Sequence, residues 1–533
     1  MLNFNNKKMK NTYLYIFCLS LLSLGSCSLE TQPLTPIDTS FYKTKEDAYV
    51  ALVGCYDGLQ VATGAGGLGI PVISEVMSDD CFGGTGASDG YGYAAIDEFD
   101  ISRSPSDVDL LDNNWKAYYK AIYRCNVFLT KMDQIDWQGD TALRNTYESE
   151  TKFIRAYLYF EMVRLWGNIP LLTVPSEENI PQAAPEEVYK VIAEDLVFAA
   201  ENLTTGAYNS VPGGRITKWA AKSLLGRVYL YYTGYYGKTD LAGVVTKAQA
   251  LGHLEDVIAG SGHGLVDDFS TLWPAASVDK YAGESNKEIV FSIKYTYTSD
   301  YNGNTDGNHW LVMFGMREFS SYPYGRGWGV TVNSKLWGEY DANDTRRAAT
   351  MIGIAEENIA FTKIDNQREY TGYYNKKYTP MVDKTGADIP TTPAIGGVDF
   401  QINQFQDYVV MRYSDVLLMA AELGSGSAQT YFDDVRRRAY KENFTPLPVN
   451  QDNILNERHL EFALEGVRYW DLLRQGIGIA SSTIAETTTL LSGGVSTVKT
   501  ISAAKIQETK GLQQIPNTQI TLSGNVLKQN AGW

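Results

Sequence analysis

The segment TKFIRAYLYFEMVRLWGNIPLL (residues 151–172) carries two apolar stripes at helical spacing. The first stripe consists of Phe153, Tyr157, Phe160 and Val163, and the second consists of Ile154, Leu158, Met162 and Leu165. A helix that is apolar on two faces is packed on both sides, as in stacked helical hairpins. Gly167 and Pro170 follow in the order that commonly ends a helix. The segment therefore predicts an inner helix of a helical array.

Similar patterns lie on both sides of this segment. Helices are predicted at residues 112–133, 144–166, 185–202, 216–233, 407–423, 428–440 and 452–475. Another begins near TKEDAYVALVGCYDGLQ, where Thr44 is a plausible N-cap with Asp47 three residues later. No strict repeat is visible, but paired helices of roughly 15–20 residues fit tetratricopeptide-like stacking.

The helical signal fades between about residues 260 and 400, where Gly, Asn, Tyr and Trp are frequent. EIVFSIKYTYT (residues 288–298) reads as a short strand, and strand-like pieces return after residue 476. A chain of 533 residues is too long for one compact core. We therefore predict a mainly α fold of tetratricopeptide-like helix pairs in an α-α superhelix, with an irregular loop-rich lobe that contains a few short strands.

The N-terminus has the layout of an export signal. Three lysines precede an apolar stretch from Tyr13 to Leu24, which is too short to span a bilayer comfortably. Leu24-Gly25-Ser26-Cys27 then resembles the bacterial lipobox, in which the cysteine thiol carries the lipid. We predict a signal peptide over residues 1–26, lipidation at Cys27 and a tether over residues 27–40. The alternative is an ordinary signal peptide with a chance cysteine.

Charge and cysteine usage exclude several classes of protein. The net charge is -16, and removal of residues 1–26 takes away three lysines and no acid, which leaves -19. Such a chain does not suit a nucleic-acid partner, because phosphate binding needs a basic surface. The remaining cysteines, Cys55, Cys81 and Cys125, have neither disulfide-framework nor zinc spacing. The four histidines also show no metal-binding spacing, and we predict no metal site.

Six separate segments resemble one known family, the SusD/RagB surface lipoproteins of bacterial nutrient-uptake systems. They are FYKTKEDAYVALVGCYDGL, WKAYYKAIYRCNVFL, FIRAYLYFEMVRLWGNIPLL, MRYSDVLLMAAEL, ILNERHLEFALEGVRYWDLLRQG and IPNTQITLSGNVLKQNAGW. They occur in the family's order, and together they are more specific than any one alone. The ending QNAGW departs from the family's usual QNPGY or QNPGW.

This resemblance implies a fold of four tetratricopeptide-like helix pairs, with an N-terminal domain over residues 41–285 and a C-terminal domain over residues 286–533. It also implies a protein that is anchored by palmitate-type acyl chains to the outer face of the outer membrane. Such proteins sit as a lid on a SusC-type TonB-dependent transporter, capture oligosaccharides or in some cases peptides, and are not enzymes. A glycosidase and a scaffold or adhesin are the alternatives from other classes.

Charged residues in the family motifs could suggest catalysis. Glu457, Glu461 and Glu465 recur every four residues among arginines, and Arg412 precedes Asp415 by three. Paired carboxylates can hydrolyse glycosides. Carboxylates that alternate with arginine on helices more often form salt bridges between packed helices, and we predict that role here.

Three short motifs match functional patterns without their structural context. GAGGLG (residues 64–69) follows a helix where a dinucleotide site needs a strand, and GASDG (residues 86–90) lacks the flanks of a nucleophile elbow. DYNGNTDGNHW (residues 300–310) begins like a calcium loop, but its twelfth ligand position would be Met313. We predict no cofactor, with bound Ca²⁺ as the less favoured alternative.

Two stretches combine aromatic rings with amide and carboxylate side chains, as sugar-binding surfaces do. They span residues 79–100 and 273–328, and the resemblance places binding loops in both regions. The candidate ligand-binding residues are Tyr91, Tyr93, Trp273, Tyr281, Tyr301, Asn302, Asn308 and Trp310. A peptide ligand would use the same loops with more backbone hydrogen bonding.

Overall fold

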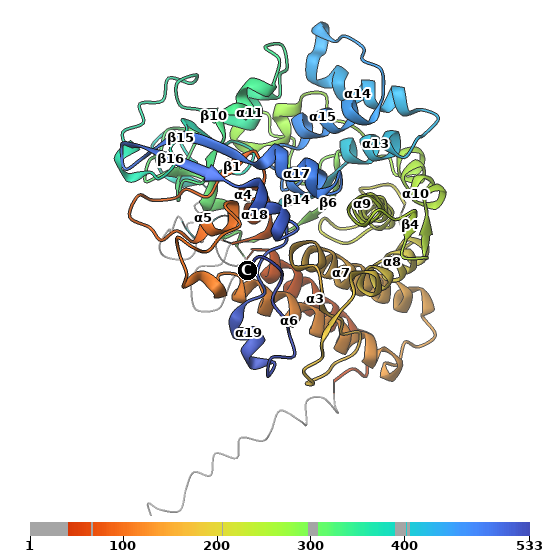
Figure 1. Cartoon of the computed structure of the whole chain (residues 1–533). Coiled ribbons are helices and arrows are strands. Elements are labelled where there is room, and N and C mark those ends of the chain that lie inside the picture. Colours follow the sequence, from red (N-terminus) through yellow and green to blue (C-terminus); the bar gives the residue numbers. More distant parts are fainter. Residues whose placement is uncertain are drawn as a thin grey trace, which may run out of the picture.

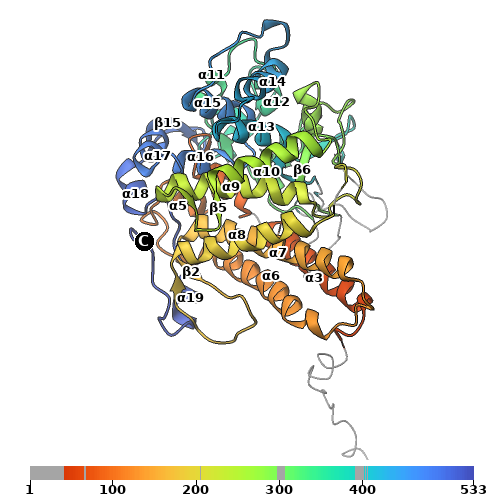
Figure 2. The same cartoon turned by 90° about the vertical axis from the view of Figure 1, so that its right-hand side faces the viewer.

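Eight helices of the protein pack as four consecutive pairs in the computed structural model, which describes residues 41–64, 68–204, 206–296, 307–389, 401, 404 and 406–533. The pairs are α3 (Lys45–Gly64) with α6 (Asp112–Lys131), α7 (Thr141–Trp166) with α8 (Pro185–Asn202), α9 (Lys218–Tyr236) with α10 (Lys247–Gly260), and α13 (Tyr413–Glu422) with α14 (Ala428–Tyr440). Figure 2 shows the first three pairs stacked against one another. The prediction of tetratricopeptide-like helix pairs is confirmed.

The central helix behaves as its pattern predicts. Both apolar stripes of α7 are buried, and Gly167 ends the helix at φ 69°, where glycine is favoured. Asp140 caps its N-terminus by accepting a hydrogen bond from the Leu143 amide at 3.1 Å. The predicted cap of α3 is also confirmed, since Thr44 Oγ1 accepts from the Asp47 amide at 3.2 Å and Asp47 Oδ2 accepts from the Thr44 amide at 2.9 Å.

The second lobe is rich in loops and gathers segments that are distant in sequence (Figure 1). Its strands form two-stranded sheets: β1 (Cys81–Phe82) with β9 (Thr331–Val332), β6 (Ile289–Ile293) with β14 (Tyr408–Arg412), β7 (Met316–Arg317) with β8 (Arg326–Gly327), β10 (Met351–Gly353) with β11 (Tyr373–Asn375), β12 (Met381–Val382) with β13 (Asp388–Ile389), and β15 (Glu486–Ser492) with β16 (Val495–Ile501). All these pairs are antiparallel except β7 with β8. The predicted irregular lobe with short strands is confirmed.

Short elements complete the described chain. The helices are α4 (Ile70–Val76), α5 (Gly92–Asp97), α11 (Ser334–Glu339), α12 (Arg347–Thr350), α15 (Gln451–Phe462), α16 (Arg468–Leu473), α17 (Ile477–Ile484), α18 (Ala503–Glu508) and α19 (Asn517–Leu522). The strands are β2 (Ile169–Pro170) with β3 (Gln182–Ala183) and β4 (Asp240–Leu241) with β5 (Val245–Thr246).

Two predicted helices are wrong in detail. Residues 407–423 form strand β14 followed by helix α13, so Arg412 ends a strand and does not share a helix with Asp415. Residues 452–475 break into α15 and α16, because Leu464 and Gly466 adopt left-handed φ values of 66° and 80°. Glu461 therefore lies on α15, whereas Glu465 lies in the break. Side-chain periodicity alone did not reveal these backbone turns.

The C-terminal segment returns to the central helix. The Gln513 amide donates to the Leu165 carbonyl at 2.9 Å, and Trp166 Nε1 donates to the Gln514 carbonyl at 3.1 Å. Asn530 Nδ2 donates to the Trp166 carbonyl at 3.0 Å. These bonds tie residues more than 340 positions apart in sequence.

No described helix has the length and apolar character that a membrane crossing requires. The predicted signal peptide, Cys27 and the tether lie outside the described residues. The domain boundary between residues 285 and 286 stays a prediction. The loop-rich lobe draws on both sides of that boundary, since β1 pairs with β9.

Candidate functional site

The carboxylates that could suggest a glycosidase are buried in ion pairs. Arg412 reaches Glu288 at 2.7 Å, Glu461 at 2.8 Å and Glu465 at 2.8 Å. All four side chains are at most 3% exposed. A substrate cannot reach these groups, so the predicted salt-bridge role is confirmed.

These residues belong to a larger buried network, which we call the core web. Its acids are Glu288, Asp344, Glu457, Glu461 and Glu465, and its bases are Arg346, Lys377, Arg412, Arg436 and Arg438. Burial works to raise the pKa of Glu461, but the guanidinium groups of Arg438, Arg412 and Arg346 hold that pKa well below its usual range. Glu461 therefore stays ionised, and the core web serves as a structural joint.

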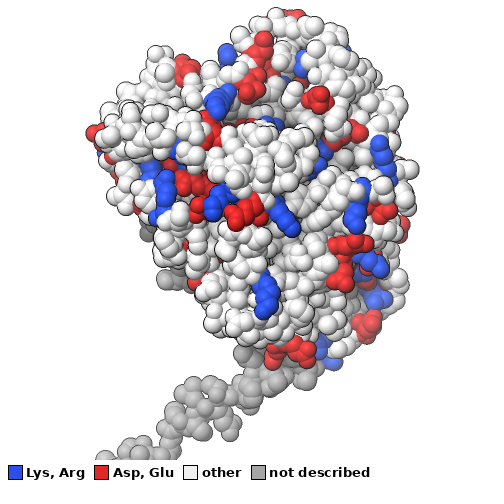
Figure 3. Space-filling view, viewed as in Figure 1, with Lys and Arg blue, Asp and Glu red and all other residues white. Residues whose placement is uncertain are grey.

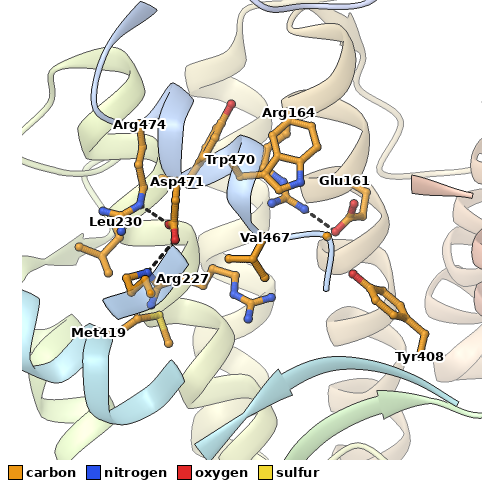
Figure 4. Close-up of a pocket in the computed structure, with 13 residues that line it drawn as sticks. Glu161, Arg164, Arg227, Leu230, Tyr408, Met419, Val467, Trp470, Asp471 and Arg474 are labelled. Atoms are coloured by element: carbon orange, nitrogen blue, oxygen red, sulfur yellow. Dashed lines mark hydrogen bonds and ion pairs between the residues drawn. The ribbon is translucent and has the colours of Figure 1, made fainter. Parts of the chain in front are cut away.

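An internal cavity of about 30 Å³ lies beside this joint (Figure 4). Figure 4 shows Arg164 paired with Glu161, at 2.5 Å, and Arg474 paired with Asp471, at 2.8 Å, on its walls. A cavity of this size admits one or two water molecules and no sugar ring. It is therefore part of the folded interior and not a glycan-binding site.

One close group of three possible metal ligands occurs among the described residues, namely Asp79, Asp80 and His459. Protein partners already engage all three. Asp79 accepts two hydrogen bonds of 2.8 Å from Arg468, and Asp80 Oδ1 lies 2.7 Å from His459 Nε2. The group is an ion-pair cluster, and its chemistry does not call for a metal.

Three of the predicted ligand-binding residues are part of the core. Trp310 is 0% exposed and packs against Tyr378 and Tyr408, and Trp273 is 1% exposed and also packs against Tyr378. Asn308 is 0% exposed. Its Oδ1 accepts from the Leu311 amide at 3.1 Å, and its Nδ2 donates to the Gln406 carbonyl at 3.0 Å. None of these three side chains offers a free face to a ligand, so we exclude them from the site developed below.

We also leave three further candidate residues, Tyr281, Tyr301 and Asn302, out of the site developed below. Tyr301 and Asn302 lie outside the described residues. Tyr281 is half-buried, and its pKa is raised by burial and by neighbouring Glu284, which precedes β6, and Asp407, which directly precedes β14. The structure therefore does not bring Tyr281 to the position of Tyr91 and Tyr93.

Tyr91 is exposed at the surface, and its ring packs against the guanidinium group of a buried arginine. Tyr91 is 40% exposed. It is the N-cap residue that directly precedes helix α5. The guanidinium carbon of Arg368 lies 4.0 Å from the ring centroid, and that of Arg103 lies 4.3 Å from it. Arg368 is 4% exposed and donates to the Gly90 carbonyl at 2.7 Å and to the Asp89 carbonyl. Arg368 therefore fixes the loop that carries Tyr91.

An ion pair and two further rings complete the same surface. Asp89 Oδ2 lies 3.2 Å from Arg317 Nη1, and the Arg317 guanidinium carbon lies 5.0 Å from the Trp328 ring. The half-buried Tyr93 is close to Asp89, since burial and then Asp89 raise the pKa of its hydroxyl. We call Asp89, Tyr91, Tyr93, Arg317 and Trp328 the aromatic cluster. Tyr91 is exposed, Asp89, Tyr93 and Trp328 are half-buried, and Arg317 is buried beneath them.

Sequence reasoning found Tyr91 and Tyr93 but missed the residues that hold them. Arg317 and Arg368 belong to segments with no motif, more than 220 residues away from Asp89 in the chain. Trp328 lies in the segment GRGWG, whose sequence does not reveal that it neighbours Asp89. Only the folded chain reveals these contacts, because no spacing rule connects the segments.

The surface around these loops has no dominant sign of charge. On the face drawn in Figure 3, acidic and basic side chains intermingle and large areas carry neither. Lys505, for example, lies between Asp100 at 3.6 Å and Glu508 at 3.7 Å. Such a surface suits a neutral polar ligand better than a polyanion.

The fold and the cluster define a class of protein: a helical-repeat scaffold that presents an open aromatic surface on a loop-rich lobe. Comparison with known families narrows that class. The sequence model described as "SusD family" matches residues 287–533, and the model described as "Starch-binding associating with outer membrane" matches residues 93–230. The chain belongs to the SusD/RagB family.

Individual relatives agree with this assignment. SusD-like protein P2 from Formosa agariphila is 27% identical over 508 residues, which cover 89% of this chain and 91% of that protein. A solved "Laminarin binding SusD-like protein" is 26% identical with a TM-score of 0.71, over 92% of this chain and 100% of that one. Surface glycan-binding protein A from Bacteroides thetaiotaomicron, solved with laminarihexaose, has a TM-score of 0.73 at 24% identity over the same shares.

Proposed function

We propose that this protein is a non-catalytic, surface-exposed glycan-binding protein of the outer membrane, which captures an oligosaccharide and delivers it to a SusC-type TonB-dependent transporter. The observation that carries the proposal is the aromatic cluster, where exposed Tyr91 stands beside the Asp89–Arg317 ion pair. The solved laminarin-binding relative and the starch-binding family description support a glycan as the ligand class.

The chemistry of capture follows from the ligand. A pyranose ring has apolar C–H faces and a rim of hydroxyl groups, so aromatic faces bind its plane and charged groups bind its rim. Tyr91 supplies the exposed ring and Asp89 accepts hydrogen bonds at the rim, while the buried Arg317 holds Asp89 in place. An open surface leaves both ends of a long chain free. Binding of this kind is modest in strength and reversible, as delivery to a transporter requires.

Anchoring and delivery are the finer parts of the proposal. Lipid on Cys27 would hold the protein at the membrane, and the tether over residues 27–40 would let it move over the transporter. We expect Cys27→Ala to give a soluble, folded protein that binds glycan but no longer supports uptake. Fractionation and a growth assay on the glycan measure this, and a variant that stays in the membrane fraction contradicts the anchor.

Isothermal titration tests ligand capture directly. Laminarin and starch oligosaccharides form the first panel, and peptides of similar length form the second. We expect Tyr91→Ala to weaken glycan binding about tenfold, the usual loss for a stacking ring. Tyr123→Ala is the matched control, because Tyr123 is 51% exposed on helix α6 and belongs to the other lobe. Equal affinity of the two variants contradicts the site.

Three other outcomes would change or contradict parts of the proposal. Binding of peptides with no binding of glycans would keep the capture role and replace its ligand. Release of shorter sugars during incubation, measured by a reducing-end assay, would contradict the non-catalytic claim. Absence of an outer-membrane barrel from the co-purified proteins would contradict delivery to a transporter.

A further inference from the structure

Lys499 lies at the centre of a second buried charge cluster, next to the aromatic cluster. It belongs to strand β16, and its side chain is 3% exposed. Its ammonium nitrogen lies 2.7 Å from Asp97 Oδ2, 2.8 Å from Glu369 Oε1 and 3.3 Å from Glu98 Oε1. Asp97 ends helix α5, Glu98 follows it, and Glu369 lies just before strand β11. One lysine therefore joins three segments of the lobe. We call this group the Lys499 cluster.

Negative charge is in excess in this cluster. The only other cation within ion-pair distance of the three acids, among the described residues, is Arg103, which lies 2.9 Å from Glu98 and is 39% exposed. Asp97 Oδ1 and Glu369 Oε2 are buried and have no hydrogen-bond partner. Burial raises the pKa of Asp97 to about 7, with Lys499 lowering it and Glu369 and Glu98 raising it further. Asp97 therefore changes charge near neutral pH.

Two of the three acids, Asp97 and Glu369, are bonded to or adjoin a segment of the binding surface. Asp97 Oδ2 also accepts a hydrogen bond from the Gly83 amide at 2.6 Å, at the start of the loop that carries Asp89 and Tyr91. Glu369 directly follows Arg368, whose guanidinium group lies 4.0 Å from the Tyr91 ring centroid. Lys499 thus holds both the loop and the segment that supports it.

We propose that Lys499 is the positioning residue of the glycan-binding surface, and that it keeps the loop over residues 83–93 in its binding shape when the acids around it are ionised. This inference rests on the proposed function. The groups that face Lys499 come from every element packed against it: Asp97 and Glu98 from α5 and its end, Glu369 from the segment before β11, and the Phe82 ring from β1 at 5.9 Å.

The sign of the pH effect follows from these charges. At low pH, the protonation of Asp97 removes one negative charge, which offsets the positive charge lost with the lysine, so the loop keeps its shape. Above neutral pH, three ionised carboxylates repel one another unless an ammonium group stands between them. Loss of Lys499 therefore makes glycan binding depend on acid, whereas the unaltered protein binds on both sides of neutrality.

The test compares Lys499→Met with the control Lys505→Met. Both variants remove one lysine from the C-terminal region, but Lys505 is 38% exposed and pairs with Asp100 and Glu508 instead. Titration with laminarihexaose at about pH 5.5 and about pH 9 gives the affinity on each side of the Asp97 transition; the alkaline point is high because loss of the Lys499 charge raises the Asp97 pKa further. Hydrogen exchange of the amides in residues 83–93 reports the loop without any ligand.

We expect Lys499→Met to bind like the unaltered protein at the acidic pH and about tenfold more weakly at the alkaline pH. Its loop amides should exchange faster only at the alkaline pH, and Lys505→Met should match the unaltered protein throughout. Unchanged affinity and unchanged exchange in Lys499→Met at both pH values overturn the inference.

A second variant guards against misfolding. The double variant Lys499→Met with Asp97→Asn removes one charge of each sign, so the burial of net charge does not increase. Because asparagine mimics the protonated Asp97, we expect the double variant to bind like the unaltered protein at both pH values. A folded double variant that binds as weakly at the alkaline pH as Lys499→Met overturns the inference. If the unaltered protein binds no glycan, the proposed function fails, and the loop exchange rates still decide whether Lys499 positions the loop.

Discussion

The core web and the Lys499 cluster both consist of buried ion pairs, but they differ in the balance of charge. Acids and bases are equal in number in the core web, whereas acids outnumber bases in the Lys499 cluster. In the core web, five acids meet five bases, and Glu461 alone contacts Arg346, Arg412 and Arg438. In the Lys499 cluster, three acids share one buried lysine and one partly exposed arginine. The first region joins the helical scaffold to the loop-rich lobe, and the second lies beneath the proposed binding surface.

This difference separates a structural role from a sensitive one. Balanced buried charges hold the pKa of Glu461 well below its usual range, so Glu461 stays ionised at physiological pH. Unbalanced charges place the pKa of Asp97 at about 7, where a small change in conditions alters its charge. Removal of one partner should therefore cost much more stability in the core web than in the Lys499 cluster.

The largest effect is expected from Arg412→Ala. This change leaves Glu288, Glu461 and Glu465 short of a shared partner in a site without water access. Breaking a buried pair from one side costs about 3–5 kcal/mol, and we expect a loss of unfolding free energy near the upper end of that range. Urea denaturation measures it. A loss below about 1 kcal/mol would mean that the core web is not a structural joint.

Trp310→Ala should come second. The Trp310 ring is fully buried and contacts Phe314, Tyr378 and Tyr408, so its removal leaves a cavity that costs about 3–4 kcal/mol. Its effect on glycan binding should follow the unfolded fraction and vanish where the variant is folded. If circular dichroism shows a fully folded variant and titration shows weak binding, Trp310 contributes to glycan binding after all.

Asp97→Asn should give a smaller, pH-dependent effect. The folded-state pKa of about 7 lies above the ordinary value of 3.8, so the contribution of Asp97 to stability is full below about pH 4 and is lost as the pH rises through about 7. Asparagine cannot ionise. Between about pH 5 and 8 the unaltered protein should therefore lose about 1–3 kcal/mol more than the variant. Parallel pH profiles in thermal denaturation would contradict this.

The smallest effect is expected from Arg437→Ala, which provides the baseline for the comparison. Arg437 and its partner Asp434 lie on helix α14 with 56% and 45% of their side chains exposed, 3.1 Å apart. Exposed pairs of this kind contribute about 0–1 kcal/mol because water screens them. We expect a change in unfolding free energy within about 0.5 kcal/mol by urea denaturation. A loss comparable to that of Arg412→Ala would remove the distinction between buried and exposed pairs.

The helical half of the fold was predictable because its signals are local. Apolar stripes on α7 and the Thr44 cap depend on residues three or four apart, and both are present in the structure. The breaks at Arg412 and Leu464 were not predictable, since a strand that runs directly into a helix keeps an apolar pattern throughout.

The candidate site was predictable only in part. Composition identified the loop with Tyr91 and Tyr93, but it also selected Trp273 and Trp310, which the fold buries. Aromatic residues in Gly- and Asn-rich segments have the same appearance in sequence whether they face water or fill a core. The contacts that distinguish them join Asp89 to Arg317 and Arg368 across the whole lobe.

The return of the C-terminal segment to helix α7 has a consequence for the timing of folding. Trp166 obtains its partners from Gln514 and Asn530, and the loop beneath the binding surface obtains its lysine from position 499. A ribosome that has made the first 480 residues has therefore not yet supplied these contacts. Both regions are therefore completed only by the last part of the chain to be synthesised.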